Sequence, residues 1–299
     1  MKKIIFIFCL IFIFLIILVF IKFNNNDNNY PVYKVVAYKD NVLFKDGTSF
    51  VYRIDDYAYL LTNYHVIENC DSIYIVINDK KIQAELLNYD EYEDVAIIYI
   101  NSKYVDSFLT LDNNYDYNVG NKISIITVND VLSGKLLSDI YSYKIHYDYS
   151  YKMLDLFKFN SKIVDGNSGS PILSNNEVIG MVSMVDLNRS NSFAIPSKNL
   201  ISIISNLESG NNYRVVLGID YSNYNDGFSG VKVDNVYDDT LANNYGIVVG
   251  DVIINIDGHE VNDTLEFNYY LSKLNNKDSF LIKYYRDGVI YDSIIYLNN

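Results

Sequence analysis

The sequence predicts an all-β double barrel followed by a small α+β domain, with one apolar helix at the N-terminus. Residues 32 to about 195 contain two clusters of about six short runs rich in Val, Ile and Tyr, separated by turn residues. No helical pattern alternates with these runs, which favours antiparallel barrels over a sheet of parallel strands. After residue 213 strand and helix patterns are mixed, and residues 4–21 are apolar without interruption.

The N-terminal segment, residues 1–23, predicts an uncleaved signal anchor. Its 18 apolar residues would form a helix roughly 27 Å long, close to the thickness of the hydrocarbon layer. Lys2 and Lys3 favour a cytoplasmic N-terminus, so we expect a single-pass membrane protein whose body lies outside the cytoplasm. A cleaved signal peptide is the alternative, but Lys22-Phe23-Asn24-Asn25 offers no small-x-small cleavage site. Residues 24–31 form an Asn-rich linker.

Residues 32–207 predict the two barrels. Expected strands of the first barrel are Val32–Tyr38, Ser49–Ile54, Ala58–Asn63, Ser72–Ile77, Lys81–Asn88 and Val95–Ile100. Those of the second are Lys122–Val128, Val131–Ser138, Leu154–Phe159, Pro171–Leu173, Val178–Val185 and Ser192–Ile195. Their β-branched and aromatic residues suit pleated surfaces. Pro196–Leu207 has the apolar spacing of an amphipathic helix that closes the second barrel.

Residues 213–299 predict a separate α+β domain after the polar linker Glu208–Asn212. Its expected strands are Gly230–Val236, Val252–Ile256, Ser279–Tyr285 and Ile290–Leu297, and its expected helices are Asp239–Tyr245 and Thr264–Leu274. No internal repeat relates this domain to the barrels, so it is expected to have a role of its own.

Composition and charge exclude several classes of function. The 299 residues carry a net charge of −13, and the part after residue 23 keeps 21 basic against 37 acidic residues, a net charge of −16. A protein with this much negative charge repels phosphate backbones, and we expect no nucleic-acid partner. The two cysteines, Cys9 and Cys70, provide no disulfide framework because Cys9 lies in the apolar run. The sequence shows no cluster of metal ligands, and we expect no metal or other cofactor.

The stretch Gly166-Asn167-Ser168-Gly169-Ser170-Pro171 carries the chemistry. A serine between glycines on a tight turn exposes its hydroxyl beside backbone N–H groups. His65 and Asp94 lie upstream, and the order His, Asp, Ser is that of chymotrypsin-like hydrolases. We therefore expect Ser168 as nucleophile, His65 as general base and Asp94 as the acid that orients the imidazole. The N–H groups of Gly166 and Ser168 are expected to form the oxyanion hole.

Each of these residues also has a plainer interpretation. The serine motif alone could be a turn, and His65 alone could cap a helix. Asp90, Glu91 and Glu93 compete with Asp94, which we favour because it directly precedes the buried strand at 95–98. The other histidines are His146, in a Tyr-rich loop at 143–149, and His259, in a hairpin turn. The three residues in the correct order, divided between two strand clusters, favour the catalytic interpretation.

Residues 47–205 resemble the trypsin-like peptidase domain of the HtrA/Deg family. The matching segments are Gly47-Thr48-Ser49-Phe50, LLTNYHVI at 60–67, DVAII at 94–98, DGNSGSPIL at 165–173, VIGMVS at 178–183 and FAIPS at 193–197. The tail resembles the PDZ domain of that family through Leu217-Gly218-Ile219, residues 246–253 and Ile256-Asp257-Gly258. The resemblance implies protein quality control by a serine endopeptidase, and a trimeric or larger homo-oligomer. Ser49 and Ser170 depart from it, because glycine is usual at both positions.

Substrate contacts are expected in both domains. Lys162 lies where chymotrypsin-like enzymes often place the base of the S1 pocket. A buried Lys162 would favour acidic side chains, whereas an outward one leaves a pocket for small aliphatic residues, as the resemblance implies. The backbone of Ser183 is expected to pair with an extended substrate, and the N–H groups of Leu217, Gly218 and Ile219 with a peptide C-terminal carboxylate. The alternative for the last three residues is the start of a core strand.

The sequence thus favours a membrane-anchored serine endopeptidase that hydrolyses misfolded or exposed protein segments outside the cytoplasm. Its PDZ-like tail would bind peptide C-termini and recruit substrate or regulate activity. One alternative is a glutamate-specific processing protease like the V8-like enzymes, in which a serine at the position of Ser170 is usual but a PDZ tail is absent. The other is a chaperone or peptide-binding module whose catalytic site is silent.

Overall fold

The computed structural model describes residues 30–114, 117–147, 150–185, 191–210, 215–274 and 277–297. The expected anchor at residues 1–23 and nearly all of the Asn-rich linker lie outside these residues. Within the described ranges, no helix combines the length and the apolar character needed to cross a membrane.

The first barrel is closed and contains six strands. They are β1 (Val32–Lys39), β2 (Val42–Ile54), β3 (Tyr57–Thr62), β4 (Ser72–Ile77), β5 (Lys80–Asp90) and β6 (Val95–Asn101). Around the barrel they follow the order β1-β2-β3-β6-β5-β4, and each neighbouring pair is antiparallel. The single-turn helix α2 (Tyr64–Ile67) connects β3 to β4, and the 3-10 turn η1 (Ser102–Tyr104) follows β6.

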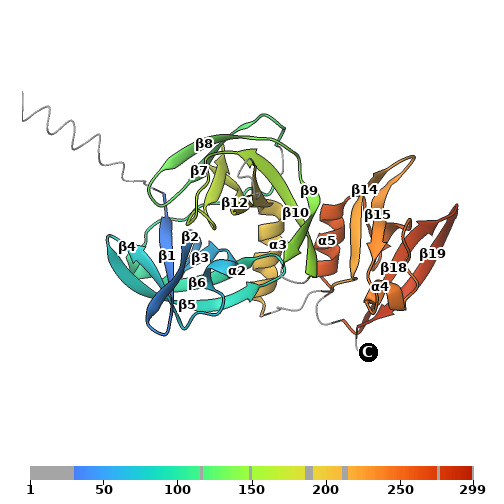
Figure 1. The fold of residues 1–299 in the computed structure, drawn as a ribbon, viewed down its shortest axis with the longest axis horizontal. Helices are drawn as coiled ribbons and strands as arrows, with labels where there is room; N and C mark the ends of the chain where they lie inside the picture. The colour runs from blue at the N-terminus through green and yellow to red at the C-terminus, as the bar shows by residue number, and fades with distance from the viewer. Residues whose placement is uncertain are drawn as a thin grey trace, which may run out of the picture.

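The second barrel also closes. Its strands are β7 (Lys122–Ile126), β8 (Val131–Leu136), β10 (Ser150–Asn160), β11 (Pro171–Ser174), β12 (Glu177–Val185) and β13 (Ser192–Pro196). Their order is β13-β12-β11-β7-β8-β10, and β13 pairs again with β10 to complete the ring. A seventh strand, β9 (Tyr141–Tyr147), extends beyond the ring by pairing with β10. The predicted double barrel is therefore confirmed (Figure 1).

The two barrels share a buried apolar cluster. Phe50 and Ile97 of the first barrel belong to the same cluster as Ile126 and Ile195 of the second. Helix α3 (Ser197–Glu208) follows β13 and adds Leu200, Ile203, Ile204 and Leu207 to it. Burial of this much apolar surface fixes the barrels against each other. Side chains contributed from the two barrels can therefore meet in a constant geometry.

The last domain is one antiparallel sheet with two helices. Its elements are β14 (Ile219–Asn225), β15 (Ser229–Val236), α4 (Leu241–Asn244), β16 (Val252–Ile256), β17 (His259–Glu260), α5 (Thr264–Ser272), β18 (Ser279–Arg286) and β19 (Val289–Tyr296). The main strand order is β14-β15-β16-β18-β19. Both predicted helices are present but shorter, and α5 begins where the Asp263 side chain accepts the Glu266 N–H. The separate α+β fold is confirmed, while its exact boundaries stay a prediction.

Two of the longer strands, β9 and β14, have no counterpart in the sequence prediction. Residues 141–147 form β9, although the sequence suggested a loop around His146. The physical reason is a period of two, with Tyr and Ile alternating with polar residues, which suits pairing with β10. Ile219–Asn225 form β14, which no expected strand covered. Its many polar residues made the alternation of buried and exposed positions hard to recognise in the sequence. The Leu217-Gly218-Ile219 segment therefore leads directly into an edge strand.

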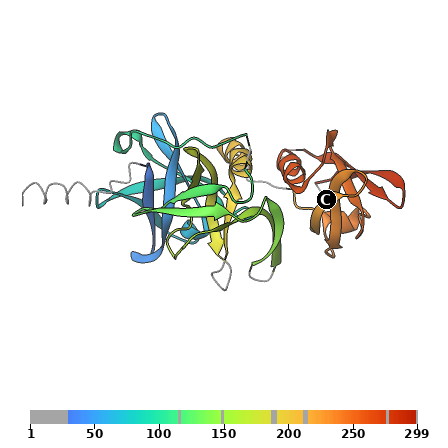
Figure 2. The same cartoon turned by 90° about the horizontal axis from the view of Figure 1, so that it is seen from above.

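The last domain docks against the second barrel through α3 and the β9–β10 hairpin (Figures 1 and 2). The Ser202 hydroxyl of α3 lies 3.1 Å from that of Ser272 on α5. Asn206 donates its side-chain N–H to the Ser272 carbonyl at 3.2 Å. On the hairpin, the buried carboxylate of Asp155 accepts a hydrogen bond from Asn268 of α5. These contacts place the two domains in a defined orientation.

Candidate active site

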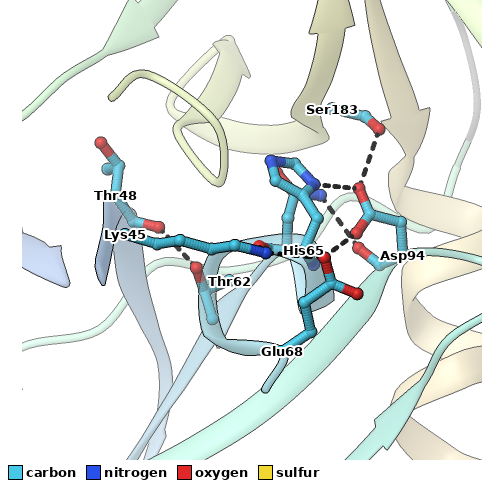
Figure 3. A network of polar contacts seen from close by, with 8 residues as sticks. Lys45, Thr48, Thr62, His65, Glu68, Asp94 and Ser183 are labelled. Carbon is cyan, nitrogen blue, oxygen red and sulfur yellow. Dashed lines mark hydrogen bonds and ion pairs between the residues drawn. The ribbon is translucent and has the colours of Figure 1, made fainter. Parts of the chain in front are cut away.

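His65 and Asp94 form a two-point contact in the first barrel. Nδ1 of His65 lies 2.8 Å from Oδ2 of Asp94, and the His65 backbone N–H donates to Oδ1 at 2.9 Å (Figure 3). Asp94 adopts φ 58°, a left-handed conformation that aspartate tolerates better than most residues. This turn lets its carboxylate reach α2 instead of continuing along β6. One carboxylate therefore fixes both the backbone and the imidazole of His65.

A side chain from the second barrel completes the surroundings of Asp94. The Ser183 hydroxyl of β12 donates to Oδ2 of Asp94 at 3.3 Å (Figure 3). The register of β12 against β13 shifts between Val182 and Met184, so Ser183 lies at a bulge. The sequence suggested only a backbone role for Ser183, because a bulge has no clear sequence signal. The contact with Asp94 is an addition from the structure.

An ion pair between Lys45 and Glu68 lies next to His65. Nζ of Lys45 donates to the His65 carbonyl at 2.8 Å and to the Glu68 carboxylate at 2.6 Å. Burial lowers the pKa of His65, but the hydrogen bond and the charge of Asp94 outweigh it. Lys45 lowers the pKa of His65 slightly and Glu68 raises it, and the net result lies above the ordinary value of 6.5. Neither Lys45 nor Glu68 belongs to a motif, so sequence analysis did not single them out.

The ion pair predicts opposite shifts in the pH dependence of hydrolysis. Because only a neutral imidazole accepts the serine proton, kcat/KM should fall as the pH drops through the pKa of His65. Glu68→Gln should move this acidic limb to lower pH, and Lys45→Met should move it to higher pH. Rates with a peptide substrate across the neutral range provide the measurement, and the double variant should cancel much of the shift. Equal limbs in all variants would contradict this assignment.

The predicted nucleophile lies on a loop of the second barrel before β11. Asn167 N–H donates to the Val164 carbonyl at 3.1 Å, and Gly166 has φ 89°, the geometry of a type II turn. Glycine is required at this position because φ is positive. No described group accepts a hydrogen bond from the N–H of Gly166 or of Ser168. The two N–H groups predicted for the oxyanion hole are thus the ones left available.

The nucleophile loop lies against β2 of the first barrel. The Thr48 N–H in β2 donates to the Ser168 carbonyl at 2.8 Å, and the Gly169 N–H donates to the Val182 carbonyl at 3.0 Å. Val182 directly precedes Ser183, which contacts Asp94. Within the described ranges no hydrogen bond joins the imidazole of His65 to the Ser168 hydroxyl. Such bonds are often long without substrate and tighten in the reacting complex.

The remaining predicted residues lie away from this cluster. Lys162 is exposed, and its role at the S1 pocket stays a prediction. Leu217 and Ile219 are buried, and Gly218 has φ 76°. The carbonyls of Leu217 and Gly218 accept from Ala242 and Tyr237, at 2.9 and 3.0 Å. Among the described residues no group of three or more His, Cys, Asp or Glu side chains could hold a metal ion.

Family models match both parts of the chain. A trypsin-like peptidase domain matches residues 47–181 and a PDZ domain matches residues 215–293. The Serine protease Do-like HtrA of Lactococcus lactis (strain IL1403) is 26% identical over 280 residues, covering 82% of this chain and 69% of that protein. A probable periplasmic serine endoprotease DegP-like of Marinomonas sp. is 28% identical over 269 residues, covering 81% and 54%. The chain thus spans about half the length of that relative.

Solved structures agree in fold. The HtrA-type protease AlgW with a tripeptide has a TM-score of 0.65 at 22% identity, covering 89% of this chain and 92% of that one. A serine endoprotease from Yersinia pestis has a TM-score of 0.61 at 20% identity, covering 89% and 93%. Each alignment covers 89% of this chain and therefore includes most of both domains. This chain belongs to the HtrA family of serine endopeptidases, with a trypsin-like peptidase domain followed by a PDZ domain.

Proposed function

We propose that His65, Asp94 and Ser168 are the catalytic triad of this endopeptidase, and that it hydrolyses misfolded or exposed protein segments. The observation that carries the assignment is the two-point hold of Asp94 on His65, with Ser183 of the second barrel on the same carboxylate. A solvated surface pair would not need contacts from three segments of the chain. The opposing loop carries Ser168, whose own N–H and that of Gly166 have no hydrogen-bond acceptor among the described residues.

The chemistry follows from these positions. The Ser168 Oγ attacks the scissile carbonyl while Nε2 of His65 takes its proton. Asp94 accepts the Nδ1–H and stabilises the imidazolium, and the N–H groups of Gly166 and Ser168 donate to the oxyanion. His65 then returns the proton to the leaving amine, which leaves an acyl-enzyme on Ser168. Water attacks the acyl group with His65 again as base, and the second product is released.

Location and assembly form a further part of the proposal. The apolar run at residues 4–21 supports a single-pass anchor with the peptidase outside the cytoplasm. The DegP-like relatives are named as periplasmic enzymes, which supports extracytoplasmic action. Family resemblance supports a trimer. Proteolysis of intact cells, with and without permeabilisation, tests on which side of the membrane the domain lies.

Cleavage by the full chain in detergent tests the enzymatic proposal. We expect digestion of β-casein and covalent labelling of Ser168 by a fluorophosphonate, identified by peptide mapping. Product sequencing from a mixed peptide library then identifies the P1 preference, with small aliphatic residues expected because Lys162 is exposed. Cuts confined to sites after Glu would select the V8-like alternative. Neither cleavage nor labelling would select the silent peptide-binding alternative.

The groove of the PDZ domain favours a role in regulating the peptidase over a role in simply recruiting substrate. A small cavity is lined by Leu217, Gly218 and Ile219 of the loop, by Phe267 and Leu271 of α5, and by Tyr92 of the peptidase domain. Met153 of β10 packs in the same buried cluster as Ile219, Tyr221 and Phe267. The peptidase domain therefore covers the place where a peptide would add to β14. We infer that a peptide C-terminus must displace this contact to bind.

This regulatory role predicts the effect of shortening Met153. Met153→Ala removes apolar contact from the covering hairpin, so peptides with a free C-terminal carboxylate should bind more tightly than to the wild type. Fluorescence anisotropy with a labelled peptide measures the affinity, and the same peptide with an amidated C-terminus is the control. Weaker or unchanged binding of the carboxylate peptide would contradict the displacement model and leave the triad assignment intact.

A further inference from the structure

Thr48 of β2 connects the two catalytic halves of the molecule. It is fully buried, yet all three of its polar backbone and side-chain groups are hydrogen-bonded. Its N–H donates to the Ser168 carbonyl at 2.8 Å, and its hydroxyl donates to the Gly166 carbonyl at 2.8 Å. Its own carbonyl accepts the Thr62 hydroxyl at 2.8 Å (Figure 3). One residue of the first barrel thus holds two carbonyls of the nucleophile loop.

The contacts divide the polar groups of the loop into two sets. The carbonyls of Gly166 and Ser168 are bound to Thr48, and the Asn167 N–H between them closes the turn on Val164. The N–H groups of Gly166 and Ser168 have no acceptor within the described part of the chain. Because a peptide group is planar, each held carbonyl fixes the plane that it shares with the next N–H, that of Asn167 or that of Gly169. The plane that carries the Ser168 N–H lies between these two, and its Asn167 carbonyl accepts the Ser170 N–H at 3.0 Å. By holding the planes on both sides of the Ser168 N–H and the plane that follows the Gly166 N–H, Thr48 limits the rotations that would turn these two N–H groups away from the oxyanion.

The fit between the strand and the loop is tight. A Cβ built on Gly169 would lie 2.1 Å from the Thr48 carbonyl oxygen and 3.1 Å from the Thr62 hydroxyl. Gly169 also has φ 88°, so a larger residue is excluded twice. Thr62 ends β3, three residues before His65. A continuous line of hydrogen bonds therefore runs from the strand that leads to the base, through Thr48, to the loop that carries the nucleophile.

We propose that Thr48 is a positioning residue, which keeps the Gly166 and Ser168 N–H groups aimed at the oxyanion and sets the nucleophile loop relative to the histidine helix. The inference rests on the proposed roles of Ser168 and Gly166. Preorganised donors stabilise the transition state only when they are already oriented, since reorientation during the reaction costs free energy. A buried threonine that merely satisfies its own polar groups would affect folding but not the transition state selectively.

Two substitutions of Thr48 distinguish a positioning role from a purely structural one, and neither is larger than threonine. Thr48→Val keeps the shape and removes the hydroxyl, whereas Thr48→Ser keeps the hydroxyl and removes a methyl group. We expect Thr48→Val to lower kcat on the order of 10- to 100-fold, below the full loss of an oxyanion donor, with KM changed little. Thr48→Ser should remain within about threefold of the wild type, because its hydroxyl can still reach the Gly166 carbonyl.

Inhibitor affinity is a measurement that a change in folding stability alone would not alter. A peptide aldehyde forms a tetrahedral adduct with its oxyanion in the hole, so Thr48→Val should weaken its binding by the same factor as kcat. The uncleaved peptide should bind a Ser168→Ala background equally with and without Thr48→Val. Melting temperatures of all variants are measured in parallel. If Thr48→Val does not fold, Thr62→Val provides the test, with a smaller loss of kcat in the same direction.

Two results would overturn the inference. One is a Thr48→Val protein with wild-type kcat and wild-type aldehyde affinity, and the other is a Thr48→Ser protein as impaired as Thr48→Val. An inactive wild-type enzyme is a different result, because it would contradict the proposed function itself. Activity of the wild type therefore separates failure of the catalytic assignment from failure of the role of Thr48.

Discussion

Ser168→Ala is expected to lower kcat for peptide hydrolysis on the order of 10⁶-fold, the size found when a serine nucleophile is removed from a triad. No acyl-enzyme can form without the hydroxyl, and the oxyanion hole alone gives only a small residual rate. The folded state should be nearly unaffected. The hydroxyl makes no hydrogen bond to any described residue, so its loss should change the free energy of unfolding by less than about 1 kcal/mol.

The same motif provides a matched control. Ser170 is two residues further along the chain, and its hydroxyl is buried without a hydrogen-bond partner among the described residues. Ser170→Ala should retain most of the activity and be at least as stable, because an unpaired buried hydroxyl costs free energy. Casein cleavage, fluorophosphonate labelling and thermal unfolding of both variants provide the comparison. Activity that survives Ser168→Ala but is lost in Ser170→Ala would show that Ser170, and not Ser168, is the nucleophile.

The barrels and the triad candidates could be predicted because their signals are local. Each strand of the first barrel has its own run of Val, Ile and Tyr, and the serine motif is a single turn with required glycines. Asp94 was identified over Asp90, Glu91 and Glu93 only by its place before a buried strand, and the structure supports that choice by two contacts to His65. The positive φ of Asp94 could not be predicted, because no sequence pattern indicated it.

The contacts that cross between segments could not be predicted in this way. Thr48 lies 118 positions from the Gly166 whose carbonyl it holds, and Ser183 lies 89 positions from Asp94. Such pairs depend on how two barrels meet, which no periodicity within one strand determines. The β9–β10 hairpin shows the same limit, because Met153 packs in the apolar cluster of the last domain. Local patterns therefore identified chemical groups, whereas tertiary packing decided their orientation.

Asp94→Asn is expected to lower kcat by about 10⁴-fold at neutral pH, the effect of the same change at the orienting aspartate in a related triad. The carboxylate accepts from the His65 N–H through one oxygen and from Nδ1 and Ser183 through the other. An amide has only one oxygen. If that oxygen keeps the backbone contact, the amide N–H groups face Nδ1, which must then accept and leaves the proton on Nε2. If the amide is reversed, two N–H groups oppose each other and the single-turn helix α2 loses its anchor.

The pH dependence distinguishes this result from simple unfolding. Burial lowers the pKa of His65, and the hydrogen bond and charge of Asp94, with a smaller effect of Glu68, raise it above its ordinary value. Asp94→Asn should therefore move the acidic limb of the kcat/KM profile to lower pH while its plateau falls. Glu91→Gln is the matched control, since Glu91 is an exposed acid three residues away, and its profile should match the wild type. A plateau within tenfold of the wild type in Asp94→Asn would transfer the orienting role to Asp90 or Glu93. Such a result would mean that the observed hydrogen bonds hold α2 in place without controlling the tautomer of the base.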